Sequence, residues 1–141
     1  MLIFLAISCQ LSAISLSTYN VFMQDFTQLN IWQKAHSFTV NIYKKTAGFP
    51  SEEKFGLTSQ MRRASVSIES NIAEGCGRNG DREFSRFIDL AQGSAYEVRC
   101  QIFIARDLDF ISADESSLLL NKISEISRMM IAFQKKLKAE G

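Results

Sequence analysis

Apolar residues recur at intervals of three and four along most of the chain, which is the spacing of one face of an α-helix. This pattern first runs over residues 30–46, after which Gly48 and Pro50 follow. Gly accepts the left-handed conformation that ends many helices, and Pro cannot continue one. We therefore expect a first helix over residues 30–46. Its expected buried positions are Ile31, Ala35, Phe38 and Ile42, broadened by Trp32, Thr39 and Tyr43.

A second helical pattern follows this break. Ser51 is a typical N-cap residue, and Glu52 and Glu53 come next, where the positive end of a helix dipole favours acidic side chains. The sequence therefore predicts that Ser51 caps a second helix, which runs to the break at residues 75–77. Its apolar seam consists of Leu57, Met61, Ala64, Ile68 and Ile72.

The third helix is expected over about residues 81–108, and it is apolar on two faces. The first seam consists of Phe84, Ile88, Ala91, Ala95, Val98, Ile102 and Ala105. The second face carries Phe87, Leu90, Tyr96, Phe103 and Ile104. A helix that is apolar nearly all round is usually buried on more than one side. This helix is therefore expected either to be central in the fold or to make a subunit contact.

Ser112 and Glu115 have the spacing of a capping box, which predicts the start of a fourth helix. The apolar positions of this helix are Leu119, Ile123, Ile126, Met130, Phe133 and Leu137. No segment alternates with the period of two that a half-buried strand requires. Because the links between these long helices are short, the sequence predicts an all-α fold, an antiparallel up-and-down four-helix bundle.

The start of the chain differs from the rest. All 16 Lys and Arg and all 15 Asp and Glu lie from Asp25 onward. A secretory signal would begin with basic residues, and a membrane-spanning helix would need about 20 mostly apolar residues. We therefore expect the biological chain to begin at Met23, with residues 1–22 an over-extended start and residues 23–141 the bundle domain. The alternative is a weak export or membrane-associating segment.

The composition, with 46% hydrophobic and 22% charged residues, is typical of one globular domain. The net charge of +1 provides no strong field toward nucleic acid, so such binding would need a local basic patch. The three cysteines form no C-x-x-C pair, which argues against a disulfide framework or a zinc ribbon. We expect a cytoplasmic protein with no metal, no cofactor and no association with a membrane.

His36 is the only histidine, so any catalytic triad or Cys–His pair would depend on it. It lies between apolar positions of the first helix, and no motif supplies the partner that a general base requires. We interpret His36 as a packed or surface histidine and predict no catalytic residue.

Gly93 lies in the middle of the third helix, where Gly costs about 1 kcal/mol relative to Ala. We expect a close helix approach to compensate, helped by small residues of the second helix: Ser59, Ser65, Ser67 and Ser70. The polar residues near these seams are interpreted as a buried or interfacial network, namely Arg62, Arg63, Asn71, Glu74 and Glu97. The alternative is that Asn71 and Glu74 belong to a ligand site.

Residues 75–80 match the pattern G-x-G-x-x-G, but a helix rather than a strand precedes them, which indicates a helix–helix turn. A helix N-terminus favours anions, and Arg78, Arg82 and Arg86 lie beside this one at intervals of four. A second basic cluster consists of Arg128, Lys135, Lys136 and Lys138. Ion pairs account for the first cluster and a solvated helix end for the second, but both are candidates for nucleic-acid binding.

Two segments, FGLTSQMRRA over residues 55–64 and SNIAEGCGR over residues 70–78, resemble the bacterial four-helix bundle proteins of the 23S rRNA intervening-sequence family. The resemblance continues through residues 29–35, 87–97 and 104–108, and excludes residues 1–22. It implies a homopentameric ring and no established enzyme activity. A more distant resemblance is to the accessory protein of diversity-generating retroelements, which partners a reverse transcriptase and binds nucleic acid. Glu69 stands where many members have proline, and Ala95 where a larger aliphatic residue is common.

These observations lead to three functional hypotheses. The first is a non-enzymatic homopentamer that binds RNA or DNA through basic clusters repeated around the ring, since several copies supply the phosphate contacts that one nearly neutral chain lacks. The second is a protein-interaction scaffold that docks a polymerase or another protein. The third is an enzyme acting on a small molecule or phosphate around residues 75–86, where no base, nucleophile or metal set is evident.

Overall fold

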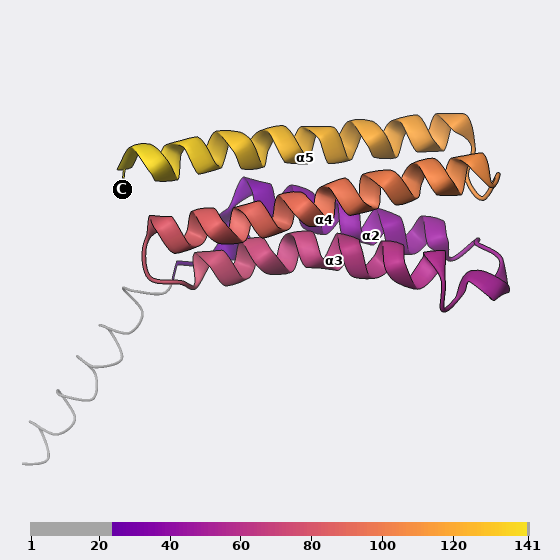
Figure 1. Cartoon of the computed structure of the whole chain (residues 1–141), viewed down its shortest axis with the longest axis horizontal. Coiled ribbons are helices and arrows are strands. Elements are labelled where there is room, and N and C mark those ends of the chain that lie inside the picture. The colour runs from indigo at the N-terminus through magenta and orange to yellow at the C-terminus, as the bar shows by residue number, and fades with distance from the viewer. Residues whose placement is uncertain (1–23, 141) are drawn as a thin grey trace, which may run out of the picture.

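The computed structural model describes residues 24–140, so the expected leader over residues 1–22 lies outside the described residues. This part of the chain contains no strand. Figure 1 shows its long helices lying side by side as one bundle, which confirms the predicted all-α class with four helices. The long helices are α2 (Asn30–Thr46), α3 (Leu57–Cys76), α4 (Asp81–Asp107) and α5 (Ala113–Glu140), and two short 3-10 turns are η1 (Phe26–Gln28) and η2 (Ser51–Glu53).

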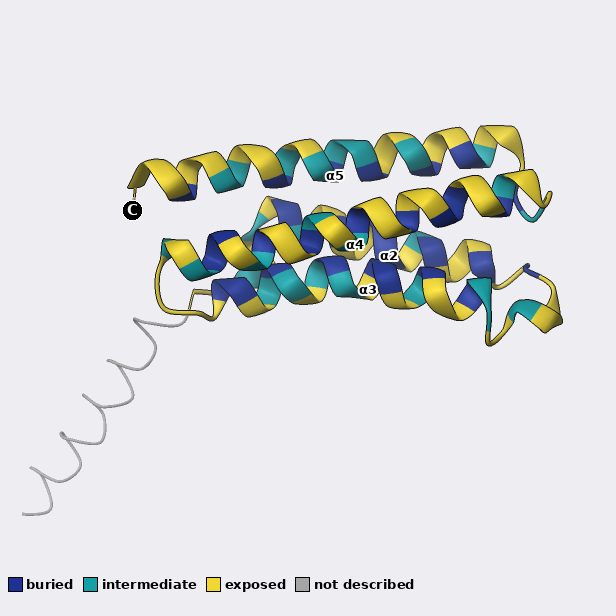
Figure 2. Ribbon diagram, viewed as in Figure 1, coloured by how far each residue is buried: buried dark blue, intermediate teal, exposed yellow. Residues whose placement is uncertain are grey.

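The core forms where the apolar seams of the four helices meet (Figure 2). Each helix has two neighbours, because α3 packs against α2 and α4, and α5 packs against α4 and α2. Every position of the first α4 seam is buried, as the sequence predicts. Near the start of α4, the rings of Phe84 and Phe133 meet edge to face with centroids 5.0 Å apart. The period of three and four therefore predicts the seams that form the core, whereas Tyr43, expected to broaden the buried stripe of α2, is 44% exposed.

The second apolar face of α4 is mostly exposed, although Phe87 is half-buried. Leu90 is 50% exposed and Tyr96 is 66% exposed, so α4 is not central in the bundle. A Cβ added to Gly93 would meet nothing within 4 Å, and the expected close approach at this glycine is wrong within the single chain. The adjacent Ser94 makes the predicted small-residue contact instead, because its hydroxyl lies 2.8 Å from that of Ser67 on α3.

The start of α3 differs from the prediction that Ser51 caps it. Residues Ser51–Glu53 form the separate turn η2, and α3 begins only at Leu57. Glu53 reaches forward instead, and its Oε2 accepts a hydrogen bond from the Leu57 N–H at 2.8 Å. A Cβ at Gly56 would lie 2.5 Å from this same oxygen. Capping by Glu53 thus uses the space left by Gly56, three residues later in the chain. The helix α3 therefore begins several residues after the predicted cap, Ser51.

Positive φ angles in the described residues occur only at Gly80 and Asp109. The left-handed conformation expected at Gly48 is therefore absent, and α2 ends without it. A left-handed residue follows α4, namely Asp109, with φ of 59°. The Phe110 N–H donates to the Ala105 carbonyl at 2.9 Å, which is the outer bond of a Schellman motif. The turn between α4 and α5 is thus fixed by backbone hydrogen bonds.

The predicted capping box at the start of α5 is confirmed. The Glu115 N–H donates to Ser112 Oγ at 3.1 Å, and the Ser112 N–H donates to Glu115 Oε2 at 3.0 Å. None of the described helices is long and apolar enough to cross a membrane.

Candidate nucleic-acid interface

The glycines that match the phosphate-binding pattern form the turn between α3 and α4. Gly75 lies inside α3, where a Cβ would be 2.6 Å from Phe84 Cδ2 and 2.8 Å from Phe87 Cβ. Its missing side chain therefore lets the two helices approach each other. Gly80 precedes α4 with φ of 95°, a conformation that only glycine adopts readily. Both glycines serve helix packing and turn geometry, as a helix–helix turn requires.

The three arginines beside this turn differ in their partners. Arg78 Nη2 lies 2.7 Å from Glu74 Oε1, and Arg86 Nη1 lies 3.9 Å from Glu83 Oε2. Arg82 has no ion-pair partner among residues 24–140. Of the first predicted cluster, Arg82 thus keeps its charge free for a ligand.

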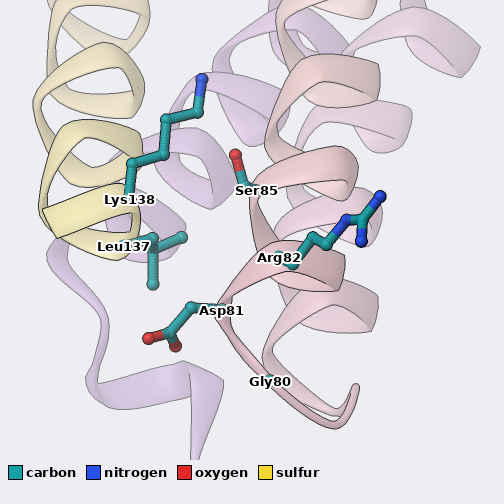
Figure 3. Close-up of a pocket in the computed structure, with 6 residues that line it drawn as sticks. All are labelled: Gly80, Asp81, Arg82, Ser85, Leu137 and Lys138. Carbon is teal, nitrogen blue, oxygen red and sulfur yellow. The ribbon is translucent and has the colours of Figure 1, made fainter. Parts of the chain in front are cut away.

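Arg82 lines a cavity of about 490 Å³ between the start of α4 and the end of α5 (Figure 3). Figure 3 shows the Arg82 side chain pointing away from Lys138 and Leu137, whereas the Asp81 carboxylate points to the side on which Leu137 lies. The two cations therefore do not converge on one point. This geometry fits separate contacts to neighbouring phosphates better than a clamp around one small anion. The lining residues are Gly80, Asp81, Arg82, Ser85, Leu137 and Lys138.

Arg128 lies in a different cavity, of about 250 Å³, farther along the contact between α4 and α5. Its neighbour there is Arg99, and no acidic side chain lines the cavity. Neither arginine has an ion-pair partner in the described part of the chain. Arg99 is absent from both predicted clusters, because only the packing of α4 against α5 brings it beside Arg128. The lining residues are Ala95, Tyr96, Arg99, Ser124, Ser127, Arg128 and Ile131.

Lys135 and Lys136 are exposed near the end of α5. Like Lys138, they have no ion-pair partner among the described residues. The structure thus separates the second predicted cluster into Arg128 in one cavity and three lysines at the helix end.

The residues expected to form one polar network make separate contacts. Asn71 Nδ2 donates to the Ser67 carbonyl at 2.8 Å, whereas Glu74 pairs with Arg78. The amide of Asn71 is thus bonded within its own helix. It shares no partner with Glu74.

The other members of this set lie toward the start of α3. Arg63 Nη2 lies 3.3 Å from Glu97 Oε1 on α4. Arg62 Nε donates to Thr46 Oγ1 at 2.8 Å, and its guanidinium carbon lies 4.7 Å from the centroid of the Tyr43 ring. Arg62 therefore joins α3 to α2, and Arg63 joins α3 to α4.

Arg62 and Arg63 also line a groove of about 490 Å³ on α2 and α3, which we call the aromatic–basic groove. It contains three cationic side chains and no acidic one. The sequence analysis did not identify Lys54 or Phe55 as site residues. The sequence feature that could have indicated this site is Phe55, an aromatic residue that lies outside the apolar seam and directly before Gly56. The groove is lined by Tyr43, Lys54, Phe55, Thr58, Ser59, Arg62, Arg63 and Val66.

Two further groups could carry acid–base or nucleophilic chemistry. His36 Nδ1 lies 2.7 Å from Glu69 Oε2, and its ring stacks on Trp32 with centroids 4.9 Å apart. Within residues 24–140, no hydroxyl or thiol is hydrogen-bonded to this imidazole. Burial raises the pKa of the Cys76 thiol, with the nearby Asp25 charge adding to the shift. A raised thiol pKa disfavours the nucleophilic thiolate.

No metal-binding group of three or more His, Cys, Asp or Glu occurs in the part of the chain that the structure describes.

A family model described as 23S rRNA-intervening sequence protein matches residues 27–132. A solved structure of a Bacteroides thetaiotaomicron protein with unknown function, from the S23 ribosomal protein family, is similar with a TM-score of 0.67 and 22% sequence identity. The match covers 74% of this chain and 98% of that chain. At this identity the likeness supports the fold alone. No curated protein matches this chain.

Proposed function

Because the chain belongs to the 23S rRNA-intervening sequence protein family, we propose that it is a homo-oligomeric four-helix bundle without enzyme activity that binds RNA or DNA. The basic side chains involved are repeated in every subunit. This arrangement gives an assembly several phosphate contacts, although one chain has a net charge of only +1.

The observation that carries the proposal is the set of unpaired cations along α4 and α5. Arg99 and Arg128 line one cavity between these helices, and Arg82 and Lys138 line another. None of the four has an acidic partner within 4 Å among the described residues. Charges that are not used for internal ion pairs are the ones available to nucleic-acid phosphates.

The exposed second face of α4 supports self-association. Leu90, Tyr96 and Ile104 place apolar surface in solvent on one helix. Gly93 lies on the same helix with open space where a side chain would be. Exposed apolar surface of this kind marks interaction sites in proteins. We propose that this face contacts another copy of the chain, in a homopentamer as the family resemblance implies.

The proposal includes the up-and-down order, with neighbouring helices antiparallel. The links over residues 77–80 and 108–112 are short, and an extended chain spans at most about 3.6 Å per residue. Such links cannot return along α4, which at about 1.5 Å per residue is roughly 40 Å long. We also place the protein in the cytoplasm, where the free Cys76 and Cys100 would stay reduced.

The first test is the salt dependence of RNA binding, measured by the fluorescence anisotropy of a short labelled RNA. We expect affinity to fall at least about tenfold between about 50 and 200 mM salt, because bound cations displace counterions from the RNA. The double variant Arg99→Glu, Arg128→Glu should bind much more weakly at low salt. Affinity that is independent of salt would contradict the proposal.

The matched control is Arg106→Glu, which makes the same charge change at a cation that is already paired with Asp107 at 2.8 Å. We expect a smaller loss of affinity for Arg106→Glu than for either single change, Arg99→Glu or Arg128→Glu. Equal losses would mean that only net charge matters and that the cations between α4 and α5 form no site.

The alternative function is a scaffold that docks a polymerase or another protein. The exposed apolar face of α4 favours it, because this face could bind a different protein instead of another copy. Native mass spectrometry of the protein purified from its own cells separates the two functions. A homo-oligomer that retains nucleic acid supports the main proposal, whereas a chain bound to a different protein supports the scaffold.

A further inference from the structure

The aromatic–basic groove lies on α2 and the start of α3, away from the α4–α5 cations described above. Its cations are Lys54, Arg62 and Arg63, and only Arg63 has an acidic partner, Glu97, among the described residues. The groove also contains Phe55, which is 88% exposed. A ligand that suits this groove is therefore anionic and has flat apolar surfaces.

Arg62 lines this groove and is oriented by two contacts to α2. Its Nε donates to Thr46 Oγ1 at 2.8 Å, and the Tyr43 ring lies 4.7 Å from the guanidinium carbon. The two terminal nitrogens of Arg62 have no hydrogen-bond partner among the described residues. An arginine that is oriented by one nitrogen and by an aromatic ring can use its remaining N–H groups for a phosphate at little entropic cost.

Phe55 is presented to solvent by the turn that precedes α3. Glu53 caps α3 through the Leu57 N–H, and Gly56 leaves the space that the Glu53 carboxylate occupies. Phe55 lies between these two residues in the chain, so its backbone belongs to a hydrogen-bonded turn. Lys54 Nζ lies 5.5 Å from the Phe55 ring centroid. An aromatic ring and a cation therefore lie next to each other in the lining of the groove.

We propose that the aromatic–basic groove binds a single-stranded nucleic acid, with a base stacked on Phe55 and phosphates contacted by Lys54, Arg62 and Arg63. In this arrangement Tyr43 positions Arg62. The inference rests on the proposed nucleic-acid binding and specifies the class of ligand. Aromatic side chains and cations that alternate along a groove are the features by which proteins hold unpaired strands.

A single strand fits better than a duplex because of Phe55. Bases in a duplex are stacked on each other, so an exposed aromatic ring cannot stack on them without opening the helix. Unpaired bases offer this face freely, and stacking is tolerant of base identity. We therefore expect single-stranded RNA and single-stranded DNA of the same sequence both to bind, with little sequence preference.

The test compares Phe55→Leu with Phe55→Tyr in the full-length protein. Both changes keep a large side chain at an exposed position, but only tyrosine can stack on a base. We expect Phe55→Leu to weaken binding of a labelled single-stranded RNA at least about fivefold and Phe55→Tyr to bind like the wild type. Binding of the matching duplex should be the same for all three proteins.

A second readout reports direct contact. Single-stranded RNA containing 5-bromouracil is crosslinked to the wild-type protein by ultraviolet light, and the protein is digested with trypsin. Cleavage after Lys54 and Arg62 releases residues 55–62, which contain Phe55. We expect the crosslink on this peptide, and a crosslink confined to peptides of α4 and α5 would overturn the groove proposal.

The outcomes separate this inference from the proposed function. If Phe55→Leu binds single strands as tightly as the wild type while Arg99→Glu, Arg128→Glu weakens binding, the groove proposal fails and nucleic-acid binding stands. If the wild type binds neither RNA nor DNA, both fail. If Phe55→Leu changes the number of subunits in a native mass spectrum, the groove is a contact with another protein chain and the proposal is overturned.

Discussion

At the scale of single residues, Gly75 sets how closely α3 and α4 approach. A Cβ at this position would lie 2.6 Å from Phe84 Cδ2 and 2.8 Å from Phe87 Cβ, and both atoms belong to large side chains of the facing helix. We expect Gly75→Ala to destabilise the fold by about 1–3 kcal/mol, as overpacking of a core does. Urea unfolding followed by circular dichroism measures this change.

Gly93→Ala is the matched control for this prediction. A Cβ at Gly93 meets nothing within 4 Å, so alanine adds only its better helix propensity, which is worth up to about 1 kcal/mol. We expect Gly93→Ala to leave the stability of the isolated chain unchanged or to raise it. If both variants lost the same stability, the close approach at Gly75 would not be the cause.

Glu115 makes the contact between α2 and α5 dependent on pH. A hydrogen bond from Lys45, followed by the Ser112 N–H, lowers the pKa of Glu115 below its ordinary value of 4.5. A lowered folded-state pKa means that the carboxylate stabilises the fold above the unfolded pKa and loses this effect as the pH falls through the folded pKa. We therefore expect Glu115→Gln to lower the urea midpoint at neutral pH.

The difference between Glu115→Gln and the wild type should shrink as the pH falls from 4.5 through the lower folded-state pKa of Glu115, because the wild-type carboxyl becomes protonated over this range. Urea midpoints measured at neutral and at acidic pH check this expectation. A difference that stays constant with pH would mean that glutamine disturbs packing rather than removing a charge.

At the scale of elements, α4 carries two apolar faces with different fates. One face is buried against α3 and α5, and the other, which includes Leu90 at 50% exposure, faces solvent. If the second face contacts another copy, Leu90→Glu places a charge in that contact and should shift the assembly toward single chains at least about tenfold. Native mass spectrometry measures the subunit number, and circular dichroism confirms that the helices remain.

The control for this element is Leu118→Glu, which changes a leucine of α5 that is 62% exposed. We expect it to leave the subunit number unchanged. An assembly that survives Leu90→Glu would show that the second face of α4 is not the contact between copies.

At the scale of the whole molecule, we expect assembly and nucleic-acid binding to depend on each other. A single chain with a net charge of +1 makes few phosphate contacts, whereas linked copies bind one strand with gains of about 10² to 10⁴ in avidity. The assembly-breaking variant Leu90→Glu should therefore bind RNA at least about tenfold more weakly and with a shallower salt dependence. Anisotropy titrations at several salt concentrations test this. Unchanged affinity in the dissociated variant would mean that each chain binds independently.

The spacing of apolar residues was sufficient to predict the four long helices and their core, because a period of three and four is a local property of the chain. Residues 30–46 have the boundaries that the pattern predicts, and Ser112 and Glu115 form the predicted capping box. The helix periodicity did not predict the start of α3. Glu53 caps that helix, and Gly56 has no side chain in the space that the Glu53 carboxylate occupies.

Which charges are free and which surfaces are exposed depends on how the helices pack. Arg78 and Arg82 look alike in sequence, yet only Arg78 has an acidic partner among the described residues. Arg99 meets Arg128 only because α4 packs against α5, and Phe55 borders a groove only because α2 lies beside α3. Contacts between residues far apart in the chain depend on how the helices pack, and helix periodicity carries no information about them.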